Sequence, residues 1–177
     1  MVVLGDVGRS PRMQYHTASL ASLPGTHVSL VGYAGERCID AVERSASVSQ
    51  FLLGSPFARL PRALFLLWAP LKVLYQVLQL FWTLLVVIPR PSTILVQNPP
   101  SIPALLAVWV ACRLRGSNMI IDWHNFGYSM LAHGLGARHP LVAVARVYER
   151  TFARLADGHI CVTRAMQGWL QEHWGVT

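Results

Sequence analysis

Charged residues are scarce in this sequence, and lysine is almost absent. Only 13% of the 177 residues are charged, about half the usual share, whereas 53% are hydrophobic. Lys72 is the one lysine, so arginine carries nearly all of the net charge of +7. Such a chain attracts anions, but no dense basic run alternates with aromatic residues, which argues against nucleic acid. Anionic lipid and phosphate-bearing substrates remain, and a membrane or a second domain can cover the excess apolar surface.

Cysteine is also rare, and the common metal and redox motifs are missing. Cys38, Cys112 and Cys161 lie far apart, which excludes a CxxC motif and argues against a disulfide framework. The histidines show no HExxH spacing, and GxSxG, P-loop and EF-hand motifs are absent. The apolar run after Met1 reaches a turn at Gly5 without the regions of a signal peptide. We therefore expect no cleaved leader, no metal and no bound cofactor.

Short apolar runs alternate with helical stretches along the chain. Strands are expected at residues 2–4, 27–33, 48–53, 94–97, 119–123 and 159–162, and helices at 11–23, 38–44, 101–113, 141–155 and 163–173. The run at 119–121 is apolar on both faces, as a central parallel strand requires. Strands separated by helices predict an α/β fold with a Rossmann-like, doubly wound parallel sheet, in one domain over residues 1–177.

The most unusual segment is residues 63–88, in which Lys72 is the single charge. As a helix it would be roughly 39 Å long, longer than a bilayer core of about 30 Å, so a transmembrane helix is one interpretation. Against it, Pro70 would kink the helix and Lys72 would be costly in lipid. A narrow polar stripe is formed by Lys72, Gln76, Gln79 and Thr83.

That stripe favours a helix lying in the membrane interface, while an ordinary buried core helix is a third alternative. The membrane-facing candidates include residues that favour the depth of the head groups. They are Trp68, Lys72, Tyr75, Leu78, Phe81 and Trp82.

Three polar loops follow expected strands, where open parallel sheets bind their ligands. The first contains Gly5, Asp6, Gly8, Arg9 and Ser10. Its glycines let the backbone approach a ligand, and the helix N-terminus that follows favours an anion, to which Arg9 can add a phosphate contact. A plain strand-to-helix turn is the alternative interpretation.

The second loop holds Asn98 before two prolines, and an asparagine there can bond sugar hydroxyls or cap the next helix. The third loop, residues 122–129, concentrates polar and aromatic side chains at a strand end. Its candidate residues are His124, Asn125, Gly127, Tyr128 and Ser129. His124 titrates near neutral pH, so it can take a proton from a hydroxyl, and the aromatic rings suit the apolar faces of sugars. Either loop could instead be a structural turn.

Four segments together resemble the chitobiosyldiphosphodolichol beta-mannosyltransferase family, in order and in spacing. They are residues 3–16, 97–100, 121–129 and 161–166. The resemblance covers most of the chain and is weakest between about residues 34 and 93. It implies the N-terminal, acceptor-side domain of a GT-B glycosyltransferase, without the C-terminal nucleotide-sugar domain and without the family's N-terminal anchor.

The implied reaction transfers mannose from GDP-mannose to GlcNAc2-diphosphate-dolichol, with inversion to the beta linkage. It belongs to protein N-glycosylation at the cytosolic face of the endoplasmic reticulum membrane. An inverting transfer needs a base for the acceptor hydroxyl and stabilisation of the leaving diphosphate. His124 is the favoured base and Asp6 the alternative.

The resemblance also implies a set of residues that bind the acceptor or its diphosphate. They are Gly5, Gly8, Arg9, Ser10, Asn98, Asn125, Gly127, Tyr128 and Ser129. The expected partners are dolichol-diphosphate-linked chitobiose, membrane lipid, GDP-mannose through the missing domain, and other transferases of the pathway. We expect the chain to be inactive alone. The alternative is a non-catalytic, membrane-associated interaction protein derived from that enzyme.

Overall fold

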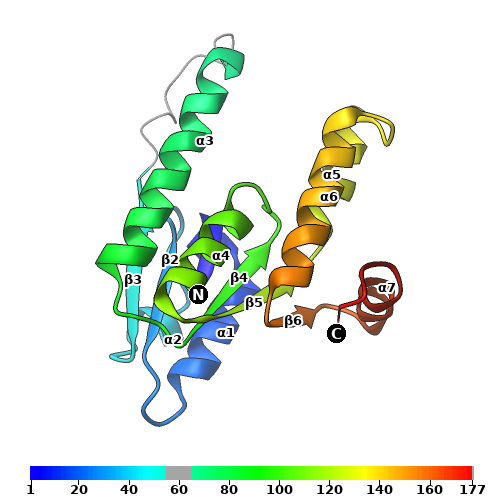
Figure 1. Ribbon diagram of the computed structural model, residues 1–177. Helices are drawn as coiled ribbons and strands as arrows, with labels where there is room; N and C mark the ends of the chain where they lie inside the picture. The colour runs from blue at the N-terminus through cyan, green and yellow to red at the C-terminus, as the bar shows by residue number, and fades with distance from the viewer. Residues whose placement is uncertain (55–64, 177) are drawn as a thin grey trace. The chain divides into compact units, whose positions relative to one another are not determined.

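The computed structural model describes residues 1–54 and 65–176. Its chain divides into two compact units, Met1–Pro89 and Arg90–Thr177. Both units are built from parallel strands and helices (Figure 1).

The first unit contains three parallel strands in the order β3-β2-β1. They are β1 (Val2–Asp6), β2 (Val28–Tyr33) and β3 (Val48–Leu53). The short 3-10 turn η1 (Val7–Arg9) leads from β1 into α1 (Pro11–Ala21), and α2 (Asp40–Glu43) lies between β2 and β3. Pro11 occupies the first turn of α1, where its missing N–H costs no hydrogen bond. Fully buried apolar side chains of β1 and β2, such as Val2 and Leu30, form the core.

The first unit also contains α3 (Phe65–Trp82), which ends in the π-helical turn η4 (Thr83–Val87). The polar stripe expected here faces the protein. Thr83 is buried, and the Gln79 amide, suitably oriented, pairs with both the N–H and the C=O of Gly54 at 2.8 and 3.0 Å. A second stripe on the same helix consists of large exposed apolar side chains, and its members are Leu71, Leu74, Leu78 and Trp82.

A transmembrane helix was one of three interpretations of residues 63–88, and the described part of that segment does not support it. Within residues 1–54 and 65–176, no helix is both long enough and apolar enough to cross a bilayer. Leu78 and Trp82 are about 60% exposed, at 59% and 62%, whereas Lys72, Tyr75 and Phe81 are half-buried. Residues 63–64 and the side chain of Trp68 lie outside the described part of the chain.

The second unit contains three more parallel strands in the order β4-β5-β6. They are β4 (Thr93–Asn98), β5 (Asn118–Trp123) and β6 (Gly158–Cys161). Its helices are α4 (Ala104–Arg115), α5 (Gly127–Leu135), α6 (Pro140–Leu155) and α7 (Arg164–Trp174). Helices α5 and α6 form a hairpin (Figure 1). Gly116 ends α4 in the left-handed conformation, with φ of 61°, which glycine adopts without a steric penalty.

Helix α5 is the element that the sequence pattern did not predict. Residues 122–129 were expected to form a loop, but the loop ends at Phe126 and α5 begins at Gly127. Gly5 and Asp6, expected in the first loop, belong to β1. The remaining strands and helices lie where they were predicted, with bounds that differ by a few residues. Each unit repeats the strand–helix–strand topology of one half of a Rossmann-like doubly wound fold, which confirms the predicted class.

Candidate functional site

His124 stands directly after β5, and its backbone N–H donates to the carbonyl of Asn98 at 2.9 Å. This bond continues the pairing of β4 with β5 by one residue. The His124 side chain is 30% exposed, and its Nε2 lies 3.5 Å from Oδ2 of the fully buried Asp122. Among the described residues Nε2 has no hydrogen-bond partner, so its contact with Asp122 becomes an ion pair only when the imidazole is protonated.

Asn98 joins the second loop to the third. Its side chain is fully buried, and its amide nitrogen donates to the carbonyl oxygen of Asn125 at 3.3 Å. The structure therefore brings together the polar loops that follow β4 and β5, as their parallel arrangement predicts. Because it is buried, Asn98 acts here by holding the loop of His124, and a bond to a sugar hydroxyl stays a prediction.

Glu149 of α6 is a buried carboxylate at the start of α5, and sequence analysis missed it. It is fully buried and accepts a 2.6 Å hydrogen bond from the Ser101 hydroxyl. Among the described residues its second oxygen, Oε2, is buried without a hydrogen-bond partner. Burial raises the pKa of Glu149, and nearby polar groups, with Ser101 first, oppose the rise. A carboxylate near a helix N-terminus is favourable beside the free N–H groups there, so the position of Glu149 favours a helix that begins at Gly127.

Gly127 has a steric reason to be glycine. A Cβ at this position would collide with the Glu149 carboxylate and would lie 2.8 Å from the Ser101 hydroxyl. Gly127 is thus a point of close packing between α5 and α6. Tyr128 and Ser129, predicted to bind a ligand, form the first turn of α5, and the carbonyl of Ser129 is bonded to the His133 ring at 2.7 Å.

The aromatic residues of this segment pack against one another and against α7. Phe126 lies 4.6 Å from Trp169 and 5.5 Å from Tyr128, measured between ring centroids. Trp123 is fully buried and donates from its indole nitrogen to Nδ1 of His159 at 3.1 Å. The expectation that these rings suit sugar faces therefore does not hold for Trp123, whose ring is covered by protein.

The first polar loop belongs to the first unit, and Asp6 organises it. The carboxylate of Asp6 accepts from the backbone N–H of Gly8 at 2.9 Å and from that of Glu36 at 3.0 and 3.1 Å. Its backbone carbonyl accepts from the Ser10 hydroxyl at 3.3 Å, so Ser10 does not cap α1 with its side chain. Asp6 thus ties the end of β1 to the segment that follows β2. Gly5 lies in the strand itself.

Arg9 reaches the surface from the same loop. Its guanidinium donates twice to Oε1 of Glu36, at 2.7 and 3.0 Å, and lies 3.5 Å from the Asp6 carboxylate. The side chain is 70% exposed, so it can still approach an anion. A Cβ on Gly8 would collide with the backbone carbonyl of Glu36. Gly8 is therefore needed for the contact between two loops.

Buried Gln14 is a further residue that sequence analysis missed. Its amide nitrogen donates to the carbonyls of Val7 and Gly8 at 3.0 and 2.8 Å, and its oxygen accepts from the N–H of Ile39 at 2.7 Å. Gln14 thus gives a partner to the Gly8 carbonyl and a second partner to the Val7 carbonyl, which also accepts from the Ser10 N–H. A polar residue on the buried face of an amphipathic helix was the available signal, and Glu149 in α6 gave the same signal.

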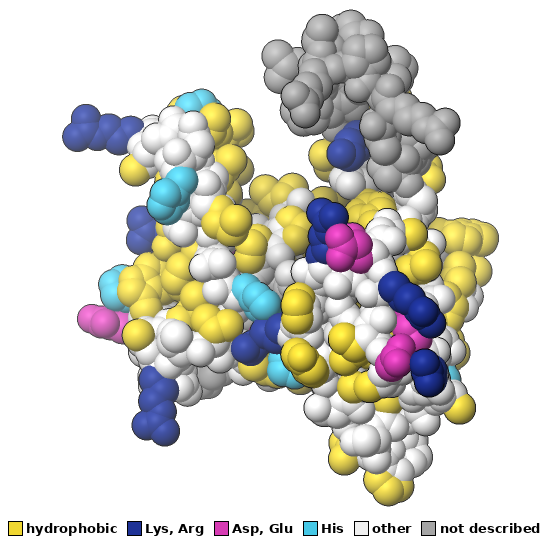
Figure 2. Space-filling model, turned by 180° about the vertical axis from the view of Figure 1, so that it is seen from behind, with side chains coloured by type: hydrophobic (Ala, Val, Ile, Leu, Met, Phe, Trp, Pro, Cys, Tyr) yellow, Lys and Arg dark blue, Asp and Glu magenta, His cyan; other side chains and the backbone are white. Residues whose placement is uncertain are grey.

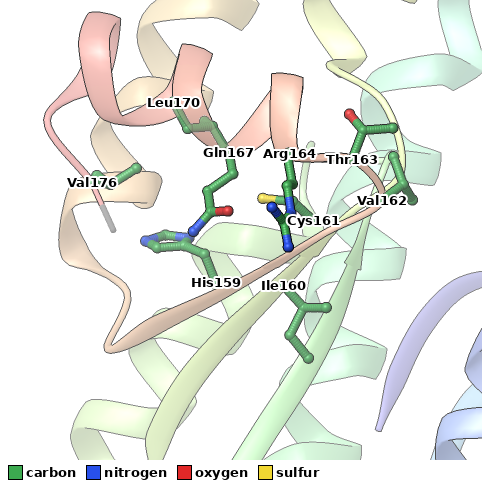
Figure 3. A pocket seen from close by; sticks show the side chains of 9 residues that line it. All are labelled: His159, Ile160, Cys161, Val162, Thr163, Arg164, Gln167, Leu170 and Val176. Atoms are coloured by element: carbon green, nitrogen blue, oxygen red, sulfur yellow. The ribbon is translucent and has the colours of Figure 1, made fainter.

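A pocket of about 400 Å³ lies beside the end of β6 and the start of α7. Figure 3 shows the Gln167 amide pointing toward the His159 ring, with Cys161 and Arg164 nearby. Its size is within the range of small-molecule sites, but none of the predicted site residues lines it. In the part of the chain that the structure describes, no group of three or more histidine, cysteine or acidic side chains is arranged to hold a metal.

The sequence of this chain matches a known protein family. The family model for the glycosyl transferase 4-like domain matches residues 8–177. The UDP-glycosyltransferase TURAN of Arabidopsis thaliana is 43% identical over 99% of this chain and 38% of its own length. The chitobiosyldiphosphodolichol beta-mannosyltransferases of Dictyostelium discoideum and Homo sapiens are each 39% identical over 99% of this chain.

The alignments with the Dictyostelium and human proteins cover 38% and 37% of those relatives, so the chain spans less than two fifths of their length. The relatives confirm the resemblance that four segments of the sequence indicated. The glycosyl transferase 4-like domain belongs to the GT-B fold, in agreement with the Rossmann-like topology of both units. The chain therefore belongs to the glycosyl transferase 4-like domain family.

Proposed function

We propose that this chain supplies the acceptor-binding and base-bearing part of a glycosyltransferase acting on a lipid-linked sugar. The reaction would transfer mannose from GDP-mannose to GlcNAc2-diphosphate-dolichol, with the donor bound mainly by a further domain. Two of the relatives described above are named as beta-mannosyltransferases of chitobiosyldiphosphodolichol, which supports the sugar and the acceptor. The observation that carries the proposal is the partly exposed His124 after β5, whose Nε2 lies 3.5 Å from the buried Asp122 carboxylate.

The proposed chemistry assigns one role to each nitrogen of His124. Nδ1 accepts the proton of the acceptor hydroxyl as the new glycosidic bond forms, and Nε2 faces Asp122, which stabilises the imidazolium that results. Asp6 is the less favoured base, because its carboxylate already accepts bonds from the backbone of Gly8 and Glu36.

Binding of the acceptor diphosphate is assigned to the loop after β1. Arg9 is exposed there at the start of α1, where the N-terminal N–H groups of a helix favour an anion. The charges of Glu36 and Asp6 partly neutralise Arg9. An incoming diphosphate would therefore replace Glu36 as the partner of the guanidinium.

A membrane-bound acceptor requires the chain to work at a lipid surface. The exposed stripe of α3, comprising Leu71, Leu74, Leu78 and Trp82, supports docking in the membrane interface. A tryptophan is suited to that depth. We assign the chain to the cytosolic face of the endoplasmic reticulum membrane, where its proposed acceptor would be found.

Acceptor binding by the purified chain tests this function directly. The probe is chitobiose linked through diphosphate to a short isoprenoid, and its affinity is measured by isothermal titration calorimetry. Free chitobiose and the isoprenoid diphosphate without sugar are the controls. Tighter binding of the complete acceptor than of either control supports the proposal. Equal binding of all three, or none, contradicts it and favours a non-catalytic interaction protein.

Donor identity is tested separately, because one relative is named a UDP-glycosyltransferase. The chain is joined to the remaining portion of a relative and supplied with acceptor and either GDP-mannose or a UDP-sugar. Transfer from GDP-mannose alone supports the proposed reaction. If transfer occurs only from the UDP-sugar, the proposed acceptor stands and GDP-mannose is wrong as the donor. The isolated chain should show no turnover with either donor.

A further inference from the structure

The outer face of the α5–α6 hairpin, residues 127–155, carries large exposed apolar side chains. Leu141, Val144 and Val147 of α6 are 55%, 58% and 65% exposed. They follow one another at intervals of three residues and so form one stripe along the helix. Met130 and Leu135 of α5 are also exposed. The buried face of α6 is separate, because it consists of other residues such as Val142, Ala145 and Phe152.

A second stripe on α6 is basic. Arg146, Arg150 and Arg154 recur at intervals of four residues, and Arg138 lies in the turn between the two helices. All four side chains are exposed. The hairpin contains a single acidic residue, Glu149, and that residue is fully buried. Its surface therefore presents positive charge beside apolar side chains, without an exposed carboxylate.

This arrangement of arginines is unfavourable for the isolated helix. Like charges four residues apart destabilise a helix, and among the described residues Arg138, Arg146 and Arg150 form no ion pair with a carboxylate. Arg146 instead lies over the ring of Tyr128, 5.7 Å from its centroid. An external anion would relieve the repulsion between these guanidinium groups.

Figure 2 shows the hairpin at the upper left, with hydrophobic, arginine and histidine side chains next to one another and no acidic side chain among them. Neighbouring apolar and cationic stripes along one helix match a lipid surface. The apolar stripe would enter the boundary of the acyl chains, and the guanidinium groups would meet the phosphates of the head groups.

We propose that the outer face of the α5–α6 hairpin is a docking surface for a membrane that contains anionic lipid. This surface is distinct from the stripe of α3, and it does not depend on the transfer reaction. It places a lipid contact on the helices that follow His124, since Glu149 on the buried face of α6 packs against Gly127 at the start of α5.

Flotation of the purified chain with lipid vesicles tests the surface. One set of vesicles contains phosphatidylcholine and phosphatidylserine, and the other contains phosphatidylcholine alone. Arg146→Gln with Arg150→Gln should weaken partition onto the anionic vesicles by roughly twentyfold or more, since each basic residue near the surface contributes about fivefold. Val144→Ser with Val147→Ser should weaken partition onto the same vesicles as well.

Matched variants remove equal charge and equal apolar surface elsewhere. Arg37→Gln with Arg44→Gln removes two exposed arginines, and Leu20→Ser with Leu114→Ser removes two exposed leucines. Both control variants should bind like the wild type. All variants must keep the wild-type circular dichroism spectrum and cooperative unfolding, and any that fails is replaced by the corresponding single substitution.

The contributions of the hairpin and of α3 to lipid binding are distinguished by repeating the flotation assay with Leu74→Asp and Leu78→Asp in α3. A further loss when the hairpin variants are added to this background supports two independent contacts. Binding of the hairpin variants at the level of their matched controls overturns the proposal. So does wild-type binding that is equal on neutral and anionic vesicles, or absent on both, in which case the face is left to a protein partner.

Discussion

Ser101 donates a 2.6 Å hydrogen bond to Glu149, and both side chains are buried. The bond links the segment after β4 to α6, 48 residues further along the chain. The same carboxylate lies close against Gly127, at the start of α5. The position of the segment that carries His124 therefore depends on a residue from another helix, and the first two predictions concern that dependence.

Gly127→Ala should lower the free energy of unfolding by about 1–3 kcal/mol, the usual cost of forcing an extra methyl group into a packed site. The new Cβ would collide with Glu149 and crowd Ser101. Gly134→Ala in the same helix is the matched control, because nothing lies within 4 Å of its added Cβ, and it should be neutral or slightly stabilising. Urea unfolding measures the free energy of unfolding of both variants. Equal effects would mean that the site around Gly127 has room for a methyl group.

Glu149→Gln should change how stability depends on pH. Because burial raises the pKa of Glu149 in the folded chain, the folded state holds its proton more tightly than the unfolded state. The resulting stability is complete below the unfolded pKa and is lost as pH rises through the folded pKa. The unfolding free energy of the wild type minus that of the variant should therefore fall from acidic to neutral pH. A difference that rises over this range would contradict the assigned burial.

The alternation of apolar runs and helical stretches was enough to predict the parallel α/β class and nearly every element. Helix α5 was missed because its first residue, Gly127, packs against a carboxylate that is distant in the sequence, Glu149. A local pattern cannot show that partner. The polar stripe of α3 was recognised correctly, but periodicity alone does not show that Gln79 would turn inward to Gly54.

In the candidate site, too, the sequence predicted which residues lie at the strand ends but not how they are buried and bonded. The sequence placed His124 and Asn98 at neighbouring strand ends, and the bond between His124 N–H and the Asn98 carbonyl joins them. The sequence did not reveal that Asn98 is fully buried. Nor could it show that the Asp6 carboxylate accepts hydrogen bonds from the backbone N–H groups of Gly8 and Glu36. Burial and hydrogen-bond partners are properties of the packed chain.

His124→Ala should lower transfer by roughly a hundred- to ten-thousandfold in a chain completed with the rest of a relative, the usual contribution of a positioned base. Donor binding should be nearly unchanged. Asp122→Asn should also lower the rate, since an amide beside Nε2 cannot stabilise the imidazolium as a carboxylate does. Single-turnover rates and donor titrations separate the two effects. Full activity of His124→Ala would mean that His124 only shapes the loop. Asp6→Ala would then be the next variant to test.

Leu74→Asp with Leu78→Asp should weaken partition of the chain onto lipid vesicles, and the contact of the α5–α6 hairpin should retain the remaining binding. Both side chains are exposed, at 53% and 59%, so charges there should cost little folding stability while opposing insertion into lipid. Gln79→Ala is the contrasting variant, because it lies on the inward stripe and pairs with Gly54. It should lower the unfolding temperature and leave the apolar stripe intact. Flotation of the aspartate variant at the wild-type level would exclude this stripe as a lipid contact.

Arg9→Ala should weaken binding of the diphosphate-linked acceptor by roughly ten- to a hundredfold, the range expected for a lost hydrogen bond to a charged group. The guanidinium is exposed and shares its charge with Glu36, so its removal should change stability little. Glu36→Gln should act in the opposite direction, because it frees Arg9 from a competing carboxylate and should tighten acceptor binding.

Arg44→Ala removes an exposed arginine paired with Asp40 at 3.1 Å and serves as the charge-matched control. Calorimetry with the acceptor, and with the same sugar lacking diphosphate, distinguishes a phosphate contact from a general charge effect. If Arg9→Ala and Arg44→Ala bind the acceptor equally, Arg9 acts only in the contact with Glu36, and the diphosphate must be held by other groups.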